Sequence, residues 1–335
     1  ERVSGYSIDR LREAVREKFR TALAERRYAG VLTALAIGDQ RAIDPGEWRL
    51  FARTGVSHLM SISGLHVTMI AGLFAMLVSW GWRRSEVLAL ALPAQKAAAL
   101  AGFLAALAYC LISGFAVPAQ RTLYMVGVVA AALWLGRSTS ASRVLAAALL
   151  LVLALDPWAV LSPGFWLSFG AVAVIFYIGT SHTARPHWLA QWGRVQWAVT
   201  IGLVPLLLVI FQQVSLVSPI TNAVAIPVVG LVVTPLALAG SMLPFAWPLE
   251  LAHAILEILM MILAWLAELP SAVWQQHAPP AWTLPLALAG IAWLLLPRGF
   301  PARWLGIVLL LPLFATPSQG PRAGDLWITV LDVGQ

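Results

Sequence analysis

Hydrophobic residues in this chain form long runs that are separated by short polar breaks. Ten apolar segments can be marked, near residues 62–82, 95–113, 118–136, 142–160, 164–180, 194–211, 219–243, 250–269, 281–296 and 302–315. A helix needs roughly 20 apolar residues to cross a bilayer, and the first eight runs come close to that length. The pattern predicts an all-α polytopic membrane protein. The last two runs are short enough to be tilted, re-entrant or interfacial instead.

The segment at 219–243 differs from the others in its prolines. Pro219, Pro227 and Pro235 recur along it. A proline inside a helix removes a backbone hydrogen bond and clashes with the preceding turn. We therefore expect this segment to be broken or kinked, and broken helices at membrane depth commonly line a cavity.

Residues 1–56 precede the first apolar run and are predicted to form an amphipathic, interfacial helical arm. Over residues 8–28, apolar side chains repeat at helical spacing, while Arg12, Arg16 and Arg20 form a basic stripe. This pattern is typical of a helix that lies on the membrane surface. The alternative is a ledge that attracts phosphate groups.

Two shorter helices are expected in the rest of the arm. The first covers about residues 30–38 and is apolar. The second is predicted to begin with a capping box formed by Asp44 and Glu47, to run to Thr54 and to end at Gly55.

Composition and the two chain ends add to this outline. The 335 residues are 60% hydrophobic and 11% charged, which places the chain among membrane proteins. The chain starts at Glu1 without a signal-peptide pattern, so we expect Glu1 to be an internal boundary. Residues 317–335 are predicted to be a linker and the first strand of a truncated soluble domain. The single cysteine, Cys110, lies in an apolar run and excludes a disulfide framework.

Short loops indicate the orientation of the chain. Basic residues occur in alternate loops only: Arg83, Arg84, Lys96, Arg137, Arg143, Arg185, Arg194, Arg298 and Arg303. The loops 114–117, 161–163, 212–218 and 270–280 contain no Lys or Arg. Under the positive-inside rule the basic loops are cytoplasmic, and ten crossings then place both ends on the outer side. The arm holds 11 of the 22 basic residues, but long segments translocate largely regardless of charge.

The stretch between the arm and the first span carries the densest set of candidate residues. Small or hydroxyl-bearing side chains follow helical spacing there, with two histidines beside them: Ser57, His58, Ser61, Gly64, His66, Thr68 and Ala71. On one helix these small residues would form a single stripe. Such a stripe has two interpretations, close helix packing or the lining of a wet path.

Four further polar residues lie within or beside spans. Arg121, with Gln120 next to it, comes near the start of the third segment. It either snorkels to outer headgroups or places a cation at the mouth of an anion path. Asn222 either satisfies backbone groups freed by the prolines or touches a ligand. Ser168 is expected to pack helices, and it is also a candidate for the path.

Several chemistries find no support in the residues. The chain has neither a P-loop motif nor a zinc-protease motif. An intramembrane hydrolase could use Ser63 and His66, but both lie on one predicted helix, whereas a general base normally approaches from another element. We expect no catalytic residues, no metal site and no cofactor.

Five motifs occur together in a recognisable order. They are residues 53–66 (RTGVSHLMSISGLH), residues 115–121 (FAVPAQR), Asp156-Pro157, residues 165–169 (FWLSF) and residues 330–335 (VLDVGQ). With these motifs the chain resembles the ComEC family of DNA-internalisation competence proteins. Many relatives have Gln where this chain has Trp166.

The resemblance implies the remaining expectations about function. Residues 57–316 would be the transmembrane competence domain, between an OB-like domain and a metallo-β-lactamase-like domain. It would act as an inner-membrane channel that passes single-stranded DNA into the cytoplasm during natural transformation, without enzyme activity of its own.

The expected partners are single-stranded DNA, membrane lipid, a periplasmic DNA-binding competence protein and a separate cytoplasmic motor or strand-binding protein. DNA as substrate follows from the resemblance alone. The residues by themselves equally allow a small-solute secondary transporter with its site at segment 219–243.

Overall fold

The computed structural model describes residues 3–24, 26–136, 140–180, 187–297 and 299–315. It confirms the all-α fold, because the described residues form helices throughout except for one two-stranded ribbon. The predicted strand within residues 317–335 lies outside the described residues.

The arm consists of three helices. They are α1 (Val3–Leu23), α2 (Ala29–Ile37) and α3 (Pro45–Thr54). The capping box at Asp44 and Glu47 is present, and Gly55 ends α3 with a φ of 74°. The start of α1 differs from the predicted residue 8, and its end at Leu23 precedes the predicted residue 28.

The helices of the membrane part fall into those that could span a bilayer by length and composition and those that are shorter or less apolar. Five are long and apolar enough to cross a bilayer: α4 (Gly64–Trp82), α6 (Ala94–Ile112), α10 (Trp188–Phe211), the continuous helix Ser218–Met242 and α13 (Trp247–Ala267). The other helices are α5 (Glu86–Ala91), α7 (Val117–Trp134), α8 (Ala141–Leu155), α9 (Pro163–Thr180), α14 (Thr283–Leu294) and α15 (Leu305–Ala315).

The proline-rich segment is interrupted by a π-helix rather than broken. Its parts are α11 (Ser218–Val228), the π-helix Val229–Val233 and α12 (Thr234–Met242). Pro227 and Pro235 flank the π-helix, whose wider turns suit a stretch where prolines have removed ordinary helical hydrogen bonds.

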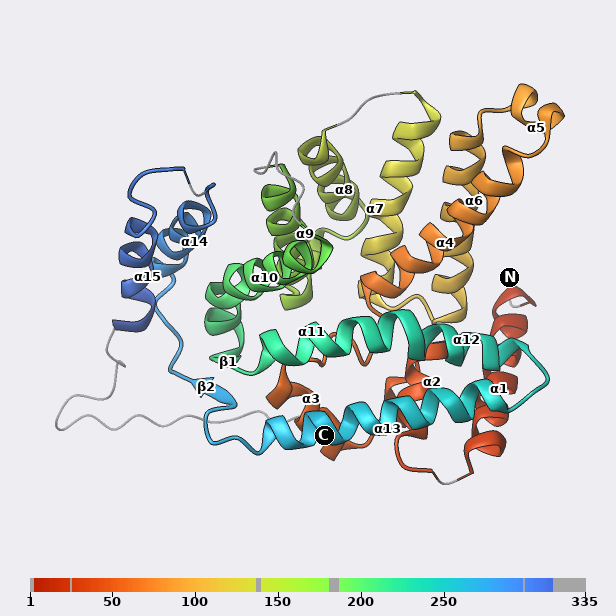
Figure 1. Cartoon of the computed structure of the whole chain (residues 1–335), viewed down its shortest axis with the longest axis horizontal. Coiled ribbons are helices and arrows are strands. Elements are labelled where there is room, and N and C mark those ends of the chain that lie inside the picture. The colour runs from red at the N-terminus through yellow and green to blue at the C-terminus, as the bar shows by residue number, and fades with distance from the viewer. Residues whose placement is uncertain (1–2, 25, 137–139, 181–186, 298, 316–335) are drawn as a thin grey trace.

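The hairpin made of α11, α12 and α13 packs against the arm. One continuous core joins Phe19, Leu35 and Phe51 of the arm to Val233 and Leu256 of the hairpin. In Figure 1 the helices of the hairpin run across the picture, while α4, α6 and α7 stand more steeply beside them. Arm and hairpin therefore form one packed unit.

The basic helix α1 is docked on protein along part of its apolar stripe. Val15, Phe19 and Leu23 are buried, whereas Leu11 stays half exposed. The guanidinium of Arg12 donates to the carbonyl of Ile37 at the end of α2 (3.4 Å). The buried residues of the stripe thus face protein, and an interfacial position of the whole arm stays a prediction.

One two-stranded ribbon closes the other end of the hairpin. Strand β1 (Gln213–Ser215) pairs antiparallel with β2 (Val273–Gln275). The hydroxyl of Ser215 donates to the carbonyl of Arg53 (2.8 Å), and Arg53 donates to the carbonyl of Ala267 (2.7 Å). The end of α3 is therefore fixed to the ribbon and to the end of α13.

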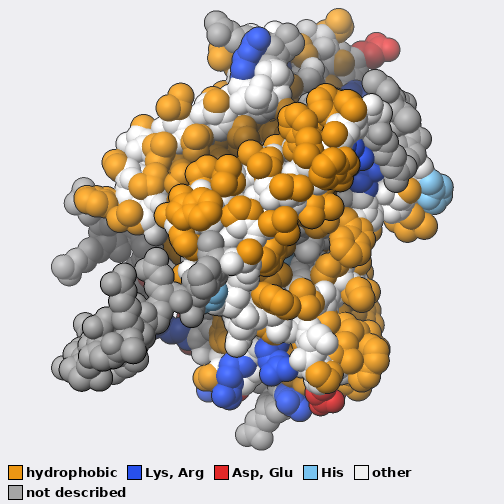
Figure 2. Space-filling model, turned by 90° about the vertical axis from the view of Figure 1, so that its left-hand side faces the viewer, with side chains coloured by type: hydrophobic (Ala, Val, Ile, Leu, Met, Phe, Trp, Pro, Cys, Tyr) orange, Lys and Arg blue, Asp and Glu red, His pale blue; other side chains and the backbone are white. Residues whose placement is uncertain are grey.

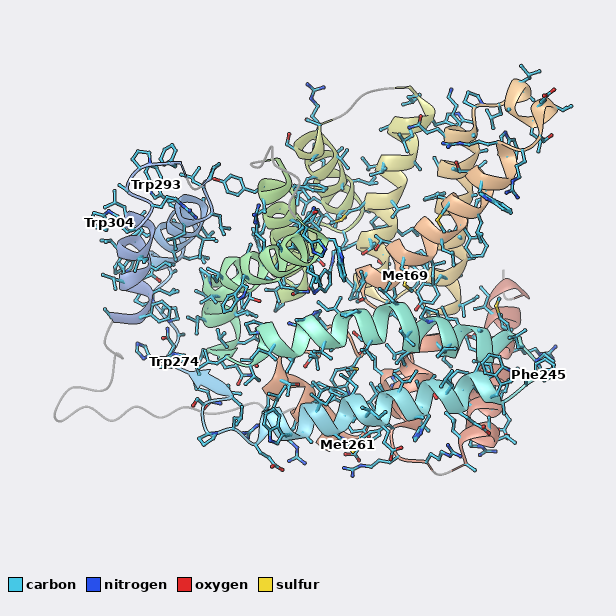
Figure 3. All side chains as sticks on the ribbon, viewed as in Figure 1. Met69, Phe245, Met261, Trp274, Trp293 and Trp304 are labelled. Carbon is cyan, nitrogen blue, oxygen red and sulfur yellow. The ribbon has the colours of Figure 1, made fainter. Side chains whose placement is uncertain are left out.

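Hydrophobic side chains cover the outside of the membrane part. Figure 2 shows them over the middle of one face, with most visible charged side chains toward its upper and lower ends. Outward-pointing residues such as Trp304 and Met261 are 63% and 60% exposed (Figure 3). This distribution is typical of a protein surrounded by lipid.

Candidate functional site

The clearest site residue is Arg121, in the second turn of α7. Its side chain is only 4% exposed. One guanidinium nitrogen, Nη2, donates to the hydroxyl of Ser168 on α9 over 3.5 Å, which is a long hydrogen bond. The nitrogens Nε and Nη1 are buried without any partner. The structure thus brings together two residues that the sequence analysis had proposed separately.

The guanidinium of Arg121 also lies against the first turn of α9. A Cβ atom on Gly164 would be 3.0 Å from Nη2 of Arg121, so only glycine leaves this space free. A helix N-terminus carries a partial positive charge. In α9, Pro163 has no N–H to add to it, and the N–H of Phe165 already donates to the carbonyl of Ser162 (3.0 Å). Two positive groups therefore meet in one buried place.

Among the described residues, no acidic side chain pairs with Arg121. Ion pairs among the described residues occur in the arm and on α13, and none of them involves Arg121. Burying an uncompensated charge costs several kcal/mol, and a cation near a helix N-terminus adds about 0.3–1 kcal/mol. An arrangement with this cost is well suited to an anionic ligand.

His66 connects this region to the π-helix. It is fully buried at the start of α4, where its Nδ1 accepts the backbone N–H of Ser63 (3.3 Å). Its other nitrogen, Nε2, lies 3.3 Å from the hydroxyl of Thr234, directly after the π-helix. Because Nδ1 accepts, the neutral ring carries its proton on Nε2 and donates it to Thr234. His66 therefore positions α4 against α12.

This geometry gives no support to a hydrolase. The hydroxyl of Ser63 lies 3.4 Å from Nδ1 of His66, but that nitrogen already accepts a backbone N–H. The residue that orients the other nitrogen is a threonine and not a carboxylate. Ser63 and His66 form a helix cap.

The predicted stripe of small residues is not one helical face, which corrects the sequence analysis. The helix begins only at Gly64, so Ser57 and Ser61 lie on the preceding turns. Gly64 packs on Thr122 of α7, where an added Cβ would be 2.5 Å from the hydroxyl. Thr68 is exposed and donates to carbonyls of its own helix.

The remaining members of the stretch have separate environments. Ala71 is buried against Gly102 of α6. His58 is exposed on the turns before α4. Contacts of Gly64 and Ala71 favour the packing interpretation for these two positions. A lining role for the others stays a prediction.

Gln120 and Asn222 each have a structural partner. The amide of Gln120 donates to the carbonyl of Phe115 (2.6 Å), a residue with a φ of 55° in the tight loop before α7. The amide of Asn222 donates to the hydroxyl of Ser218 (2.9 Å), but its Oδ1 is buried without a donor. Asn222 lies where α11 meets the end of α3, because its neighbour Thr221 donates to the carbonyl of Thr54 (2.7 Å).

Sequence reasoning missed two contributors to the site. Thr234 was not singled out, although it is a hydroxyl-bearing residue directly before Pro235 in an apolar run. Gly164 was not proposed as a site residue, and its contact with Arg121 depends on tertiary structure. The residues that the structure describes contain no cluster of three metal-ligating side chains.

Comparisons with known proteins agree with these motifs. The sequence profile of the competence protein family matches residues 35–301. Competence protein ComA of Neisseria gonorrhoeae is 40% identical over 99% of this chain and 48% of its own length.

Two further relatives are more distant. Uncharacterized protein YcaI of Escherichia coli is 29% identical over 97% of the chain and 44% of its own length. ComE operon protein 3 of Bacillus subtilis is 29% identical over 64% of the chain and 26% of its own length. The chain thus spans about half the length, or less, of the curated relatives it matches. No solved structure shows significant similarity.

The range that matches the family profile, residues 35–301, contains both His66 and Arg121. The chain belongs to the competence protein family.

Proposed function

We propose that this chain forms the membrane channel through which a competence protein passes a single DNA strand into the cytoplasm. The observation that carries the proposal is the buried contact of Arg121 with Ser168 and the start of α9, which holds positive charge without a negative partner. A strand with one negative charge per phosphate is the anion that such a protein would meet.

The energy for transport has to come from elsewhere. Moving one negative charge inward against an inside-negative potential costs about 2.3 kcal/mol per 100 mV. The sequence holds no P-loop motif. We propose that a cytoplasmic motor or strand-binding protein pulls the strand, and that a periplasmic DNA-binding competence protein delivers it.

The basic loops are proposed to face the cytoplasm. At one end of the steep helices, Arg84 stacks on Trp80 (3.5 Å), and Lys96 lies 5.8 Å from the ring of Trp134. Aromatic rings beside cations are typical of a membrane–water interface. The arm lies at the opposite end, since Arg12 would be 2.9 Å from a Cβ on Gly114, in a loop without basic residues. This arrangement supports an outer position for the arm.

The hairpin of α11–α13 is proposed to lie along the outer interface, in place of the two crossings expected from its length. Arg12 of α1 contacts the loop at Gly114, and Lys18 of α1 donates to the carbonyl of Leu243 in the turn between α12 and α13. Arg12 and Lys18 are about 9 Å apart along the axis of α1, because a helix rises 1.5 Å per residue. A bilayer core of about 30 Å does not fit between them.

Charges along the arm support the same conclusion. The arm follows the hairpin from the β ribbon at Arg53 to the turn at Leu243, and it exposes Arg16, Glu17 and Arg20 on the way. Charged side chains of this kind are not stable in hydrocarbon. Because the hairpin does not change sides, this revision leaves the predicted outer position of both ends unaltered.

A small-solute transporter remains the second candidate. The observation in its favour is the buried, unpaired Oδ1 of Asn222 on the helix that the π-helix interrupts. A polar acceptor in such a place could bind a solute donor. Family membership favours the DNA channel.

Uptake of labelled duplex DNA tests the proposal. In a transformable host that lacks the gene, labelled DNA should accumulate outside the inner membrane, with none protected in the cytoplasm. The full-length gene should restore cytoplasmic label. Normal cytoplasmic label without the gene would discard the channel and promote the transporter.

A further inference from the structure

At the start of α9, the buried guanidinium of Arg121 has two nitrogens without a hydrogen-bond partner. We propose that the guanidinium of Arg121 and the N-terminal turn of α9 form a binding site for one phosphodiester group of a single DNA strand. This inference rests on the proposed function, since it names the part of the strand that the channel wall holds.

The first argument is the meeting of two independent positive groups. The helix α9 has 18 residues, and its N-terminal turn lies under the guanidinium at Gly164. Helix N-termini and arginines both bind oxyanions in proteins. Without an anion the two positive groups repel each other, so an anion that contacts both would relieve the repulsion.

The second argument is the set of unused donors. Nε and Nη1 of Arg121 are buried without partners, although the side chain is 96% removed from solvent. Buried polar groups in folded proteins are nearly always paired. A phosphodiester carries one negative charge over two oxygens, and a guanidinium can bind two such oxygens side by side.

The third argument separates DNA from lipid as the source of the phosphodiester. A lipid headgroup would require a guanidinium at the protein surface, as in snorkelling. Arg121 instead lies inside the protein, between α7 and α9, with Ser168 as its neighbour. A strand that passes between these helices can reach it, whereas a lipid headgroup on the outer surface cannot.

The buried position also has a consequence for opening. The guanidinium is covered in this structure, so a strand reaches it only when α7 and α9 move apart. A phosphodiester can contact Arg121 only in this open arrangement. Phosphate binding therefore shifts the population toward the open arrangement. Gly164 keeps the closed arrangement compact, because a larger residue would displace the guanidinium.

Oligonucleotide binding to the purified 335-residue chain in nanodiscs of zwitterionic lipid tests the site. The probes are a fluorescent oligothymidylate and its twin with uncharged methylphosphonate links. Arg121→Gln should weaken binding of the charged probe about tenfold or more. It should also reduce the slope of log K against log salt by about 0.7, the value for one single-strand phosphate.

Two matched variants show whether an effect of Arg121→Gln is specific to this position and to the guanidinium group. Arg143→Gln removes an exposed cation at the start of α8 and should bind both probes like the unchanged chain. Arg121→Lys should fall between the unchanged chain and Arg121→Gln, because lysine keeps the charge and loses the paired donors. Binding of the uncharged probe should be equal in all variants.

A melting curve without DNA separates a binding role from a packing role. Arg121→Gln should melt at a higher temperature than the unchanged chain, since it removes a buried, unpaired charge. A lower melting temperature together with equal loss of both probes would overturn the site, as would unchanged binding of the charged probe. Stabilisation by anionic lipid that requires Arg121, without DNA binding, would assign the site to headgroups and overturn the proposal.

DNA uptake by cells distinguishes failure of the phosphate site from failure of the proposed channel. If cells with Arg121→Gln take up DNA normally while the deletion strain does not, the channel stands and the phosphate site is refuted. If the purified chain binds phosphodiesters through Arg121 but the deletion strain takes up DNA normally, the site stands and the channel is refuted.

Discussion

Arg121 is held by residues that make room for it rather than by residues that pair with it. Gly164 leaves space for the guanidinium, and Ser168 offers it one long hydrogen bond. At the neighbouring position, Thr122 is accommodated by Gly64 in the same way. Small residues around α7 therefore determine how closely α4 and α9 approach it.

The packing of Gly64 leads to a prediction about a matched pair of glycines on one helix. Gly64→Ala should lower the free energy of unfolding by about 1–3 kcal/mol, because the new Cβ would overlap the hydroxyl of Thr122. Gly72→Ala, which meets nothing within 4 Å, should be neutral or stabilise by up to about 1 kcal/mol. Thermal melts in detergent compare the two. Equal effects at both positions would show that α4 and α7 do not pack as described.

His66 allows a second prediction at the same scale. His66→Ala should destabilise the protein by about 1–3 kcal/mol, since it leaves the Ser63 N–H and the Thr234 hydroxyl without their partner. Thr234→Val should cost less, and the double variant should cost less than the sum of the two. Strict additivity in this cycle would contradict the hydrogen bond between them.

Among the secondary-structure elements, local signals were predictable and tertiary ones were not. The capping box and Gly55 predicted both ends of α3 correctly, because helix caps depend on residues that are neighbours in sequence. The first span was placed near residues 62–82, close to α4 itself, but its helical spacing was wrongly extended back to Ser57 through turns that are not helical. The π-helix was foreseen only as a break, because prolines exclude ordinary helix without specifying what replaces it.

Some residues of the candidate site could be predicted from the sequence, but their contacts could not. Arg121 and Ser168 could be named from sequence because a cation and a hydroxyl stand out in apolar runs. Their contact over 47 positions, and the part played by Gly164, could not be named. No pattern along the chain records which faces of α7 and α9 meet.

The hairpin of α11–α13 gives a prediction about membrane position. In a background with Cys110→Ala, a cysteine at Phe245 should react with a membrane-impermeant maleimide added from outside, because the turn lies beside the arm. Phe245 is 58% exposed and points away from the body (Figure 3). A cysteine at Ser142, an exposed residue in the first turn of α8 at the end proposed to face the cytoplasm, should react only after the membrane is permeabilised. Protection of Phe245→Cys until permeabilisation would show that the hairpin crosses the bilayer.

At the scale of the whole molecule, the chain consists of a steep set of helices and a crosswise unit. The first set includes α4, α6 and α7, which share a core around Tyr109 and Leu123. The second unit joins the arm to the hairpin in another core. His66 and Thr234 lie at the junction of the two. In the proposed orientation and path, a strand arriving from outside would meet the crosswise unit before it reaches Arg121 and α9.

Site-specific photocrosslinking during DNA uptake tests the channel most directly. A photoreactive amino acid is placed at Ser168 or at Ser162, which directly precedes α9 and lies beside Gly164. The full-length protein is used, and only variants that still take up DNA are scored. A matched variant carries it at Leu311, which is 54% exposed on α15. The account predicts crosslinks to incoming labelled DNA at Ser168 and Ser162 and none at Leu311. Normal uptake without any crosslink at Ser168 or Ser162 would contradict a path between α7 and α9.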